Sequence, residues 1–327
     1  MPSTELLAGL SNGFVYAAIA VYVLALLSYA ADTARRVATA PARASVPVGT
    51  GRASGHDGES VPQLDTSFSR TPALTRFSAI GTSLTVLGWL LSVAALVTRS
   101  LAAGRAPWGN MYEFTLASAV AVAVAAAYLF VLTRQPISAF GVWVVSLVLL
   151  ALGLGITVLY TPADALVPVL NSYWLVIHVA AAIVSGGIFS VGVVATILFL
   201  VRSRGERRAG DGDAPLGRYA GGLPRSETLS QVAHAAHMFA FPVWTFAILA
   251  GAIWAENSWG RYWGWDPKET WAFITWVLYA AYLHAQSTAG WRGARAAWFA
   301  VLGYLAFLFN FFGVNLWITG LHSYAGV

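Results

Sequence analysis

The residues with the most distinctive chemistry lie in one short segment, residues 256–269. It contains three tryptophans and a tyrosine within seven residues, separated by two glycines and followed by Asp-Pro-Lys-Glu. Aromatic rings offer a stacking surface to a planar ligand, and glycines let such a ligand approach the backbone. An aromatic belt at a membrane surface is also rich in Trp and Tyr, but it would explain neither the glycines nor the Asp-Pro-Lys-Glu. We therefore predict a platform for a planar ligand, formed by Trp259, Tyr262, Trp263, Trp265 and Asp266.

Two acidic positions also match helix starts. Asp266 precedes Pro267 and Glu269 follows three residues after Asp266, which is the spacing of a capping box with proline at the first helical position. Asp266 is thus expected to cap a helix, whether or not it also contacts a ligand. Asn110 and Glu113 have the same spacing, so Asn110 is expected to cap another helix. The sequence assigns Glu113 no chemical role.

The chain has six histidines and no cysteine, which excludes disulfides, thiolate metal sites and cysteine nucleophiles. His178 lies near one end of an apolar run, and His322 lies just beyond the last run. Both should lie on the same membrane face as the tryptophan-rich segment. Ionisable residues inside a membrane are costly and are usually functional. The two histidines are therefore candidate metal ligands; the alternative is a pair of interfacial histidines hydrogen-bonded to the backbone.

The other histidines are weaker candidates. His284 lies within a later apolar run, roughly 20–25 Å from the tryptophan-rich segment at helical rise, and a polar contact between helices is the alternative to a ligand role. His234 and His237 are three residues apart on one helix. They could bind a metal together, but we expect instead that both lie at the cytoplasmic interface of the membrane. His56 lies in a flexible loop, and we assign it no role.

The elements that must position these residues are membrane helices. Of the 327 residues 58% are hydrophobic and 10% are charged, whereas soluble domains carry about 25% charged residues. No cleavable signal peptide is evident before the first apolar run. We predict an all-α polytopic membrane protein with about eight spans, at residues 12–31, 77–98, 112–133, 138–159, 173–201, 237–255, 270–289 and 297–319.

The basic residues predict the orientation of these spans, because cytoplasmic loops carry an excess of Arg and Lys. Four of the nineteen basic residues fall on one side, namely Arg99, Arg105, Arg261 and Lys268. The other fifteen are arginines on the opposite side, which should be cytoplasmic, so both termini should be extracytoplasmic. Residues 34–75 and 202–225 are expected to be mobile cytoplasmic loops. We divide the chain into a first helix with its loop, residues 1–76, and a main transmembrane domain, residues 77–327.

The segment from Trp259 to Glu269 resembles the tryptophan-rich WWD signature of the haem-handling protein family. That family includes the CcsA/ResC proteins of cytochrome c maturation system II, called CcsB in actinobacteria, and CcmC and CcmF of system I. Residues 105–115 and 313–324 resemble further motifs of the CcsA/ResC branch, and the resemblance covers nearly all of residues 77–327. Eight spans favour CcsA/ResC over the shorter CcmC.

The resemblance implies that the platform binds haem b, with His178 and His322 as axial ligands on opposite faces of an outer haem. It implies an inner haem site at His284, whose second ligand comes from a ResB-type membrane protein. The chain would be a subunit of a holocytochrome c synthase in the plasma membrane. It would move haem outward and present it on the extracytoplasmic face to apocytochrome c, whose Cys-x-x-Cys-His segment supplies both thiols. The resemblance is also compatible with thiol-reducing proteins as further partners.

Two other functions remain as alternatives. A membrane cytochrome for electron transfer also uses histidines, but it usually pairs them inside the bundle on neighbouring helices. A haem exporter would move haem without any role in attachment. Formation of covalent cytochrome c by the chain with a ResB-type partner would distinguish a synthase from both.

Overall fold

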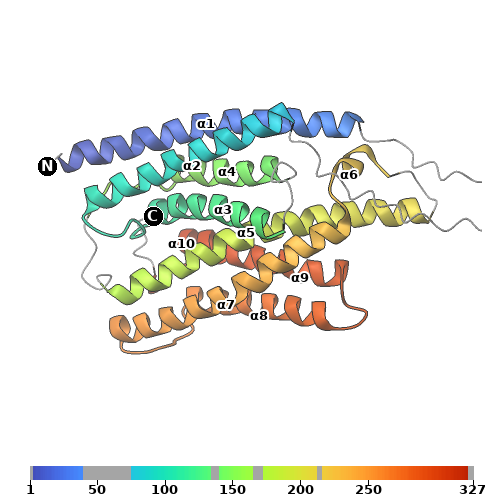
Figure 1. The fold of residues 1–327 in the computed structure, drawn as a ribbon. Coiled ribbons are helices and arrows are strands. Elements are labelled where there is room, and N and C mark those ends of the chain that lie inside the picture. The colour runs from blue at the N-terminus through green and yellow to red at the C-terminus, as the bar shows by residue number, and fades with distance from the viewer. Residues whose placement is uncertain (1–2, 40–74, 134–139, 165–171, 212–215, 323–327) are drawn as a thin grey trace, which may run out of the picture.

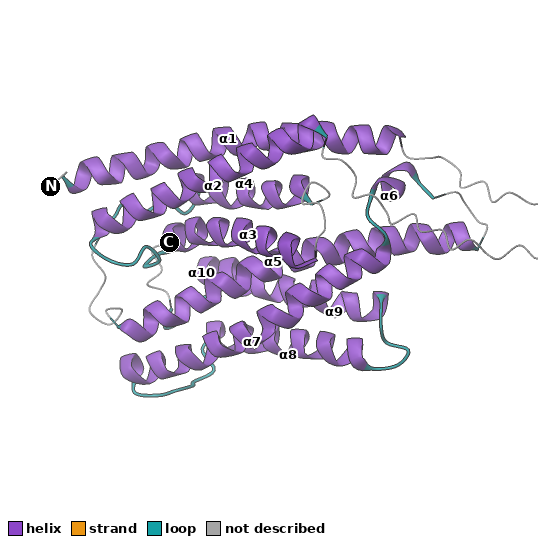
Figure 2. Cartoon of the chain, viewed as in Figure 1, coloured by secondary structure: helices purple, strands orange, loops and turns teal. Residues whose placement is uncertain are grey.

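The computed structural model describes residues 3–39, 75–133, 140–164, 172–211 and 216–322, and this part of the chain is helical, with no strand. The prediction of an all-α protein is therefore confirmed (Figure 2). Each predicted span coincides with a helix or, in the last case, with three consecutive helical segments. The elements are α1 (Thr4–Thr39), α2 (Arg76–Ala103), α3 (Met111–Thr133), α4 (Gly141–Thr157), α5 (Tyr173–Gly210), α6 (Arg218–Gly222), α7 (Ser226–Trp259), α8 (Pro267–Ser287), α9 (Ala294–Leu308), the π-helical segment η3 (Phe309–Gly313) and α10 (Val314–Trp317).

The helices form an elongated bundle in which α1 and α2 lie along one edge and α7 and α8 along the other (Figure 1). The described chain begins and ends at the same end of this bundle (Figure 1). By length and composition, five helices suffice to cross a membrane, namely α1, α2, α5, α7 and the series α9–η3–α10, and two shorter apolar stretches lie in α3 and α4. The chain is thus a multi-pass membrane protein, whereas the count of eight spans stays a prediction.

Helix α5 lies at the centre of the bundle, where it packs against α3, α7 and α9. In its most apolar stretch 78% of the residues are buried, compared with 22% in α2. Small residues permit this close packing, as in other membrane helices. A Cβ atom at Gly187 would lie 2.8 Å from the backbone carbonyl carbon of Ala121 on α3, so only glycine lets the two helices approach this closely.

The expectation of an irregular loop over residues 202–225 is wrong for much of that range. The end of α5 and the short helix α6 fall within it. Arg202 pairs with Glu206 one turn later at 2.6 Å, and Glu206 also accepts a hydrogen bond from the Ser226 hydroxyl at the start of α7. These local ion pairs and caps stabilise helix beyond the apolar run. Most of the other predicted loop, residues 40–74, lies outside the described residues.

Candidate ligand pocket at one end of the bundle

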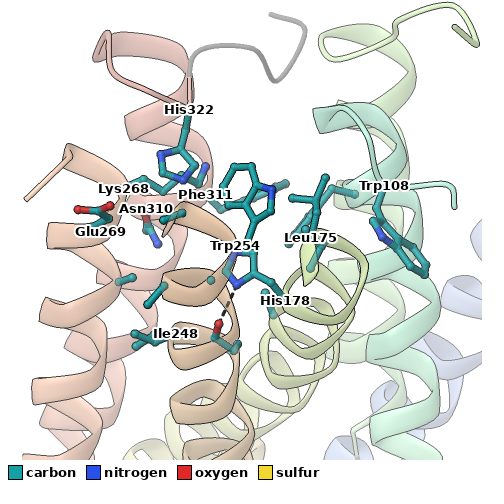
Figure 3. Close-up of a pocket in the computed structure, with 18 of the residues that line it drawn as sticks. Trp108, Leu175, His178, Ile248, Trp254, Lys268, Glu269, Asn310, Phe311 and His322 are labelled. Carbon is teal, nitrogen blue, oxygen red and sulfur yellow. Dashed lines mark hydrogen bonds between the residues drawn. The ribbon is translucent and has the colours of Figure 1, made fainter. Parts of the chain in front are cut away.

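A pocket opens at the end of the bundle where the described chain begins and ends. Its empty space is about 1200 Å³, including the open mouth. Side chains from α3, α5, α7, α8 and the C-terminal helical series converge on it (Figure 3). Aromatic and aliphatic residues make up most of its wall, with a few polar groups, which is typical of sites for small molecules. The aromatic and polar members include Trp108, Trp254, Trp259, Tyr262, Trp263, His178, His322, Lys268, Glu269, Asn310 and Asn315.

His178, from α5, has a defined tautomer. Its Nδ1 lies 2.7 Å from the carbonyl oxygen of Ala247 on α7, the hydrogen bond drawn in Figure 3. A carbonyl oxygen can only accept, so Nδ1 carries the proton and Nε2 carries the lone pair. This is the tautomer that an imidazole needs to bind a metal through Nε2, with its other nitrogen oriented by a second group. The ring lies parallel to Trp254, with their centroids 6.5 Å apart.

His322 lies beyond α10 and is held in the same way. Its Nδ1 is 2.9 Å from Oδ1 of Asp266, so in the neutral ring the proton is on Nδ1 and the lone pair on Nε2. The ring meets Trp259 edge-on at 4.9 Å and Trp254 at 5.9 Å between centroids. Burial lowers the pKa of His322 below its ordinary value, although the hydrogen bond to Asp266 acts to raise it. The imidazole is therefore neutral at pH 7.

Asp266 connects the start of α8 to the C-terminal segment. As predicted, it caps α8: its Oδ1 accepts the N–H of Lys268 at 3.1 Å, and Glu269 completes the capping box. Its Oδ2 accepts the N–H of Leu321 at 2.8 Å. Burial raises the pKa of Asp266, but the hydrogen bonds from His322, Leu321 and Lys268 outweigh it and lower the pKa to about 2. Asp266 is thus ionised, and it fixes His322 relative to α8.

The predicted platform residues divide into two groups. Trp259, Tyr262 and Trp263 line the pocket together with both histidines. Trp265 and Asp266 are not among the lining residues. The Trp265 residue is 64% exposed, its ring packs edge-on against Trp263 at 5.6 Å, and its backbone is left-handed, with φ at 59°. That conformation is unusual for a bulky residue.

The structure separates the remaining histidines. His284, on α8, is exposed on the surface of the bundle, away from the pocket. His237, which we expected at the cytoplasmic interface, is fully buried within the bundle. Its Nε2 lies 3.0 Å from the hydroxyl of Thr196 on α5, and its ring contacts Tyr279 and Tyr282 at 5.2 and 4.9 Å. Thus His237, and not His284, is enclosed by the bundle.

Glu113, to which the sequence assigned no role, is a buried structural centre. Asn110 caps α3 by accepting the N–H of Glu113 at 2.9 Å, as predicted. The Glu113 carboxylate accepts from Arg99 at 3.0 Å, from Arg105 at 2.6 Å and from the N–H of Gly109 at 2.9 Å. All three of these partners belong to residues 99–109, so the carboxylate fixes the turn between α2 and α3. That turn carries Trp108, which lines the pocket.

Sequence reasoning missed Trp108, Trp254 and the side chain of Lys268 as parts of the site. Trp108 lies within the motif at residues 105–115, which was the available signal. Trp254 precedes the tryptophan-rich segment on α7 and packs edge-on against Trp259 at 4.8 Å. Nothing in the sequence distinguishes Trp254 from an interfacial tryptophan, because its role depends on the approach of α5 and its His178.

Fold and site together define a polytopic helical membrane protein with an aromatic pocket, containing two histidines, at one end of the bundle. A family profile described as "Cytochrome C assembly protein" matches residues 108–322. The chain is 35% identical to the cytochrome c biogenesis protein CcsA of Guillardia theta over 260 residues, covering 75% of this chain and 85% of that protein. It is 34% identical to CcsA of Synechococcus elongatus, covering 77% of this chain and 89% of that protein.

A solved structure has a similar fold. The cytochrome c haem lyase CcmF superposes with a TM-score of 0.61 at 18% identity, covering 95% of this chain and 47% of CcmF. The chain thus spans about half the length of that protein, and the likeness concerns the fold. The profile and the two relatives settle the class. The chain belongs to the cytochrome c assembly protein family, in its CcsA/ResC branch, and its function lies in cytochrome c maturation.

Proposed function

We propose that the chain binds haem b in the pocket, moves it across the membrane and presents it for covalent attachment to apocytochrome c. The observation that carries the proposal is the pair of histidines. His178 and His322 come from distant parts of the chain and reach one aromatic pocket. Each is oriented through Nδ1 by an acceptor, so the neutral ring has its lone pair on Nε2, the nitrogen that would bind iron. Imidazole is a common axial ligand of haem iron.

The rest of the wall fits a planar, apolar ligand. Trp108, Trp254, Trp259 and Trp263 all line the pocket, and indole rings give large stacking areas to a porphyrin. The name of CcmF, a haem lyase of similar fold, agrees with this ligand. Under the proposal the wall holds the porphyrin, the two histidines hold its iron, and exposed Trp265 lies at the rim, where the acceptor protein arrives.

The attachment itself is an addition reaction that needs little general acid or base catalysis from the protein. Each thiol of the acceptor's Cys-x-x-Cys-His segment adds across a haem vinyl group: the S–H bond and the vinyl π bond break, a C–S bond forms at one vinyl carbon, and a C–H bond forms at the other. No electrons are gained or lost, and no leaving group departs. Positioning the vinyl groups against the thiols is then the main contribution of the protein. The absence of cysteine from the chain keeps its own thiols out of this reaction.

The proposal includes a partner and an orientation. The pocket faces the extracytoplasmic side of the plasma membrane, as the distribution of arginines favours. His284 belongs to an inner haem site whose second ligand comes from a ResB-type protein. Exposure of His284 on α8 supports this part, because a ligand shared between two proteins must lie on the surface of each.

The test compares histidine variants of the chain purified with its ResB-type partner. His178→Ala or His322→Ala should open one coordination position, so the haem spectrum should change and the yield of covalent cytochrome c should fall at least tenfold. Added imidazole should fill the open position and restore part of the yield. His284→Ala should instead lower the haem content of the complex. His234→Ala is the matched control, because this half-buried histidine lies outside the pocket.

Unchanged six-coordinate spectra and full attachment in both pocket variants would contradict the proposal. Haem binding without covalent cytochrome c, even with the partner present, would favour an electron-transfer cytochrome or an exporter. If the His284→Ala variant retains its full haem content, only the proposed inner haem site would be contradicted.

A further inference from the structure

Lys268 places an amino group in a wall that is mostly aromatic and aliphatic. It is the sole lysine of the sequence. Among the described residues that line the pocket, it is also the only lysine or arginine. Figure 3 shows it beside His322, on the wall that also carries Glu269 and Asn310. A capping box fixes the backbone at this position, but helix capping uses only the N–H of residue 268 and explains nothing about its ammonium group.

The ammonium group is held in place by Asn315. Its Nζ donates to Oδ1 of Asn315 at 2.6 Å. The amide nitrogen of Asn315 in turn donates to the carbonyl oxygen of Phe311 at 2.6 Å and contacts the sulfur of Met111 at 2.7 Å. These contacts fix the side-chain amide, so its oxygen must face Lys268. The lysine is therefore oriented by the protein before any ligand arrives.

The carboxylates nearest in sequence form their hydrogen bonds with other groups, and Oε1 of Glu269 is buried without a hydrogen-bond partner. Asp266 accepts from His322, from the N–H of Leu321 and from the N–H of Lys268. Oε2 of Glu269 accepts the N–H groups of Gly264 and Asp266. Neither carboxylate forms an ion pair with Nζ within 4.0 Å; in the described part of the chain the ion pairs involve only arginines and His322.

An ammonium group has three donors, and Asn315 takes one of them. A partly buried cation without a paired anion is costly, whereas a carboxylate brought by a ligand would form a charge-assisted hydrogen bond in a low-dielectric site. We propose that Lys268, positioned by Asn315, is the counter-ion for a propionate carboxylate of the bound porphyrin. This inference rests on the proposed function and adds to it how the pocket recognises the polar edge of its ligand. That recognition would orient the porphyrin in its plane, which axial histidines alone do not do.

The test uses two porphyrins and the full chain purified in detergent. Haem carries two propionates, and haem dimethyl ester carries none but keeps the iron and the vinyl groups. Lys268→Met should weaken haem binding about tenfold, the loss expected for one hydrogen bond to a charged group, and should leave binding of the ester unchanged. Lys268→Arg should keep most of the preference for haem. Asn315→Ala should reduce that preference by a smaller factor.

Arg295→Met is the control for net charge, because this arginine lies at the start of α9, at the opposite end of the bundle. Equal weakening of haem and of its ester by Lys268→Met would overturn the inference, since the lysine would then act only through the structure of the wall. Equal affinity of the unaltered chain for the two porphyrins would overturn it as well. If the unaltered chain binds neither porphyrin, the proposed function fails together with the inference, and the two failures are thereby distinguished.

Discussion

Asp266 combines three roles in one carboxylate: it caps α8, anchors the backbone at Leu321 and orients His322. A carboxylate that accepts the N–H of a metal-binding imidazole makes the imidazole a stronger donor to the metal. The same hydrogen bond raises the pKa of His322, while burial lowers it further than the bond can compensate. Under the proposed function, Asp266 would therefore determine both how tightly His322 binds iron and how well protons compete for it.

The substitution Asp266→Asn separates these roles, because asparagine caps helices as well as aspartate does. We expect α8 to keep its start and haem affinity to fall roughly tenfold, as for the loss of other groups that orient metal ligands. The haem midpoint potential should become more positive, because a neutral amide makes His322 a weaker donor. Helical content by circular dichroism, haem titration and a redox titration measure these effects. Unchanged affinity and potential would show that the carboxylate serves the fold alone.

The pH dependence follows from the same pair. Burial lowers the pKa of His322 from its ordinary value of 6.5, so ligation should persist as the pH falls to that value. Asp266, with its pKa lowered from 3.8 to about 2, stabilises the folded protein fully above its unfolded pKa, and this contribution is lost as the pH falls towards 2. In Asp266→Asn the pKa of His322 should fall further, so protons should compete less for its Nε2 at a given pH. An acid titration of the haem spectrum checks the sign.

At the scale of elements, the last helix changes its winding where it borders the pocket. The π-helical segment Phe309–Gly313 interrupts the series between α9 and α10. Such segments are rare and often occur at functional sites. Here three residues in or just after the segment, Asn310, Phe311 and Asn315, line the pocket. The wider turn thus gives the pocket wall an amide that holds Lys268.

Helix α7 makes room for the imidazole of α5 by means of a glycine. A Cβ atom at Gly251 would come within 2.7 Å of the His178 ring. We expect Gly251→Ala to displace that ring, to cost about 1–3 kcal/mol of stability through overpacking and to weaken haem binding. Thermal unfolding and haem titration measure the two effects. Gly153→Ala on α4 is the matched control, because a Cβ there meets nothing within 4 Å. Equal unfolding temperatures and equal haem affinities of the two variants would contradict the close packing of Gly251 against the His178 ring.

Periodicity and capping patterns predicted these elements well, and their mutual contacts poorly. The helix starts at Met111 and Pro267 follow from residues within four positions of each other, so local sequence contains them. The burial of His237 was not predicted, because it depends on contacts with α5 and α8, which lie far away in sequence. The same reason hid Trp254 and the partner of Lys268. Which helices pack against each other depends on the complementary shapes of their surfaces, and a single sequence does not reveal those contacts.

At the scale of the whole molecule, charge is distributed unequally between the two ends of the bundle. The ends of α5 and α1 and the starts of α7 and α9 carry most of the described arginines, whereas the pocket lies at the other end. This arrangement predicts that the pocket end is extracytoplasmic. The sequence alone supplied that prediction, because it depends on counting charges and not on contacts.

Because the chain lacks cysteine, single-cysteine variants report its orientation directly. Tyr262→Cys places a thiol on an exposed position at the pocket, and Arg207→Cys places one on an exposed position near the end of α5. A membrane-impermeant maleimide should label the first in intact cells and the second only after lysis. Labelling of position 207 in intact cells would reverse the orientation and place the pocket on the cytoplasmic side.

The separation of the two pocket histidines along the chain has a consequence for biosynthesis. His178 leaves the ribosome when α5 has only begun, and His322 follows only after α7, α8 and the C-terminal helical series. Asp266, which orients His322, also comes late. A growing or truncated chain therefore carries one imidazole without its counterpart, and it cannot bind both faces of a porphyrin. Under the proposed function, capture of a reactive iron compound would thus be delayed until the membrane domain is complete, and the order of synthesis would prevent haem binding by an incomplete chain.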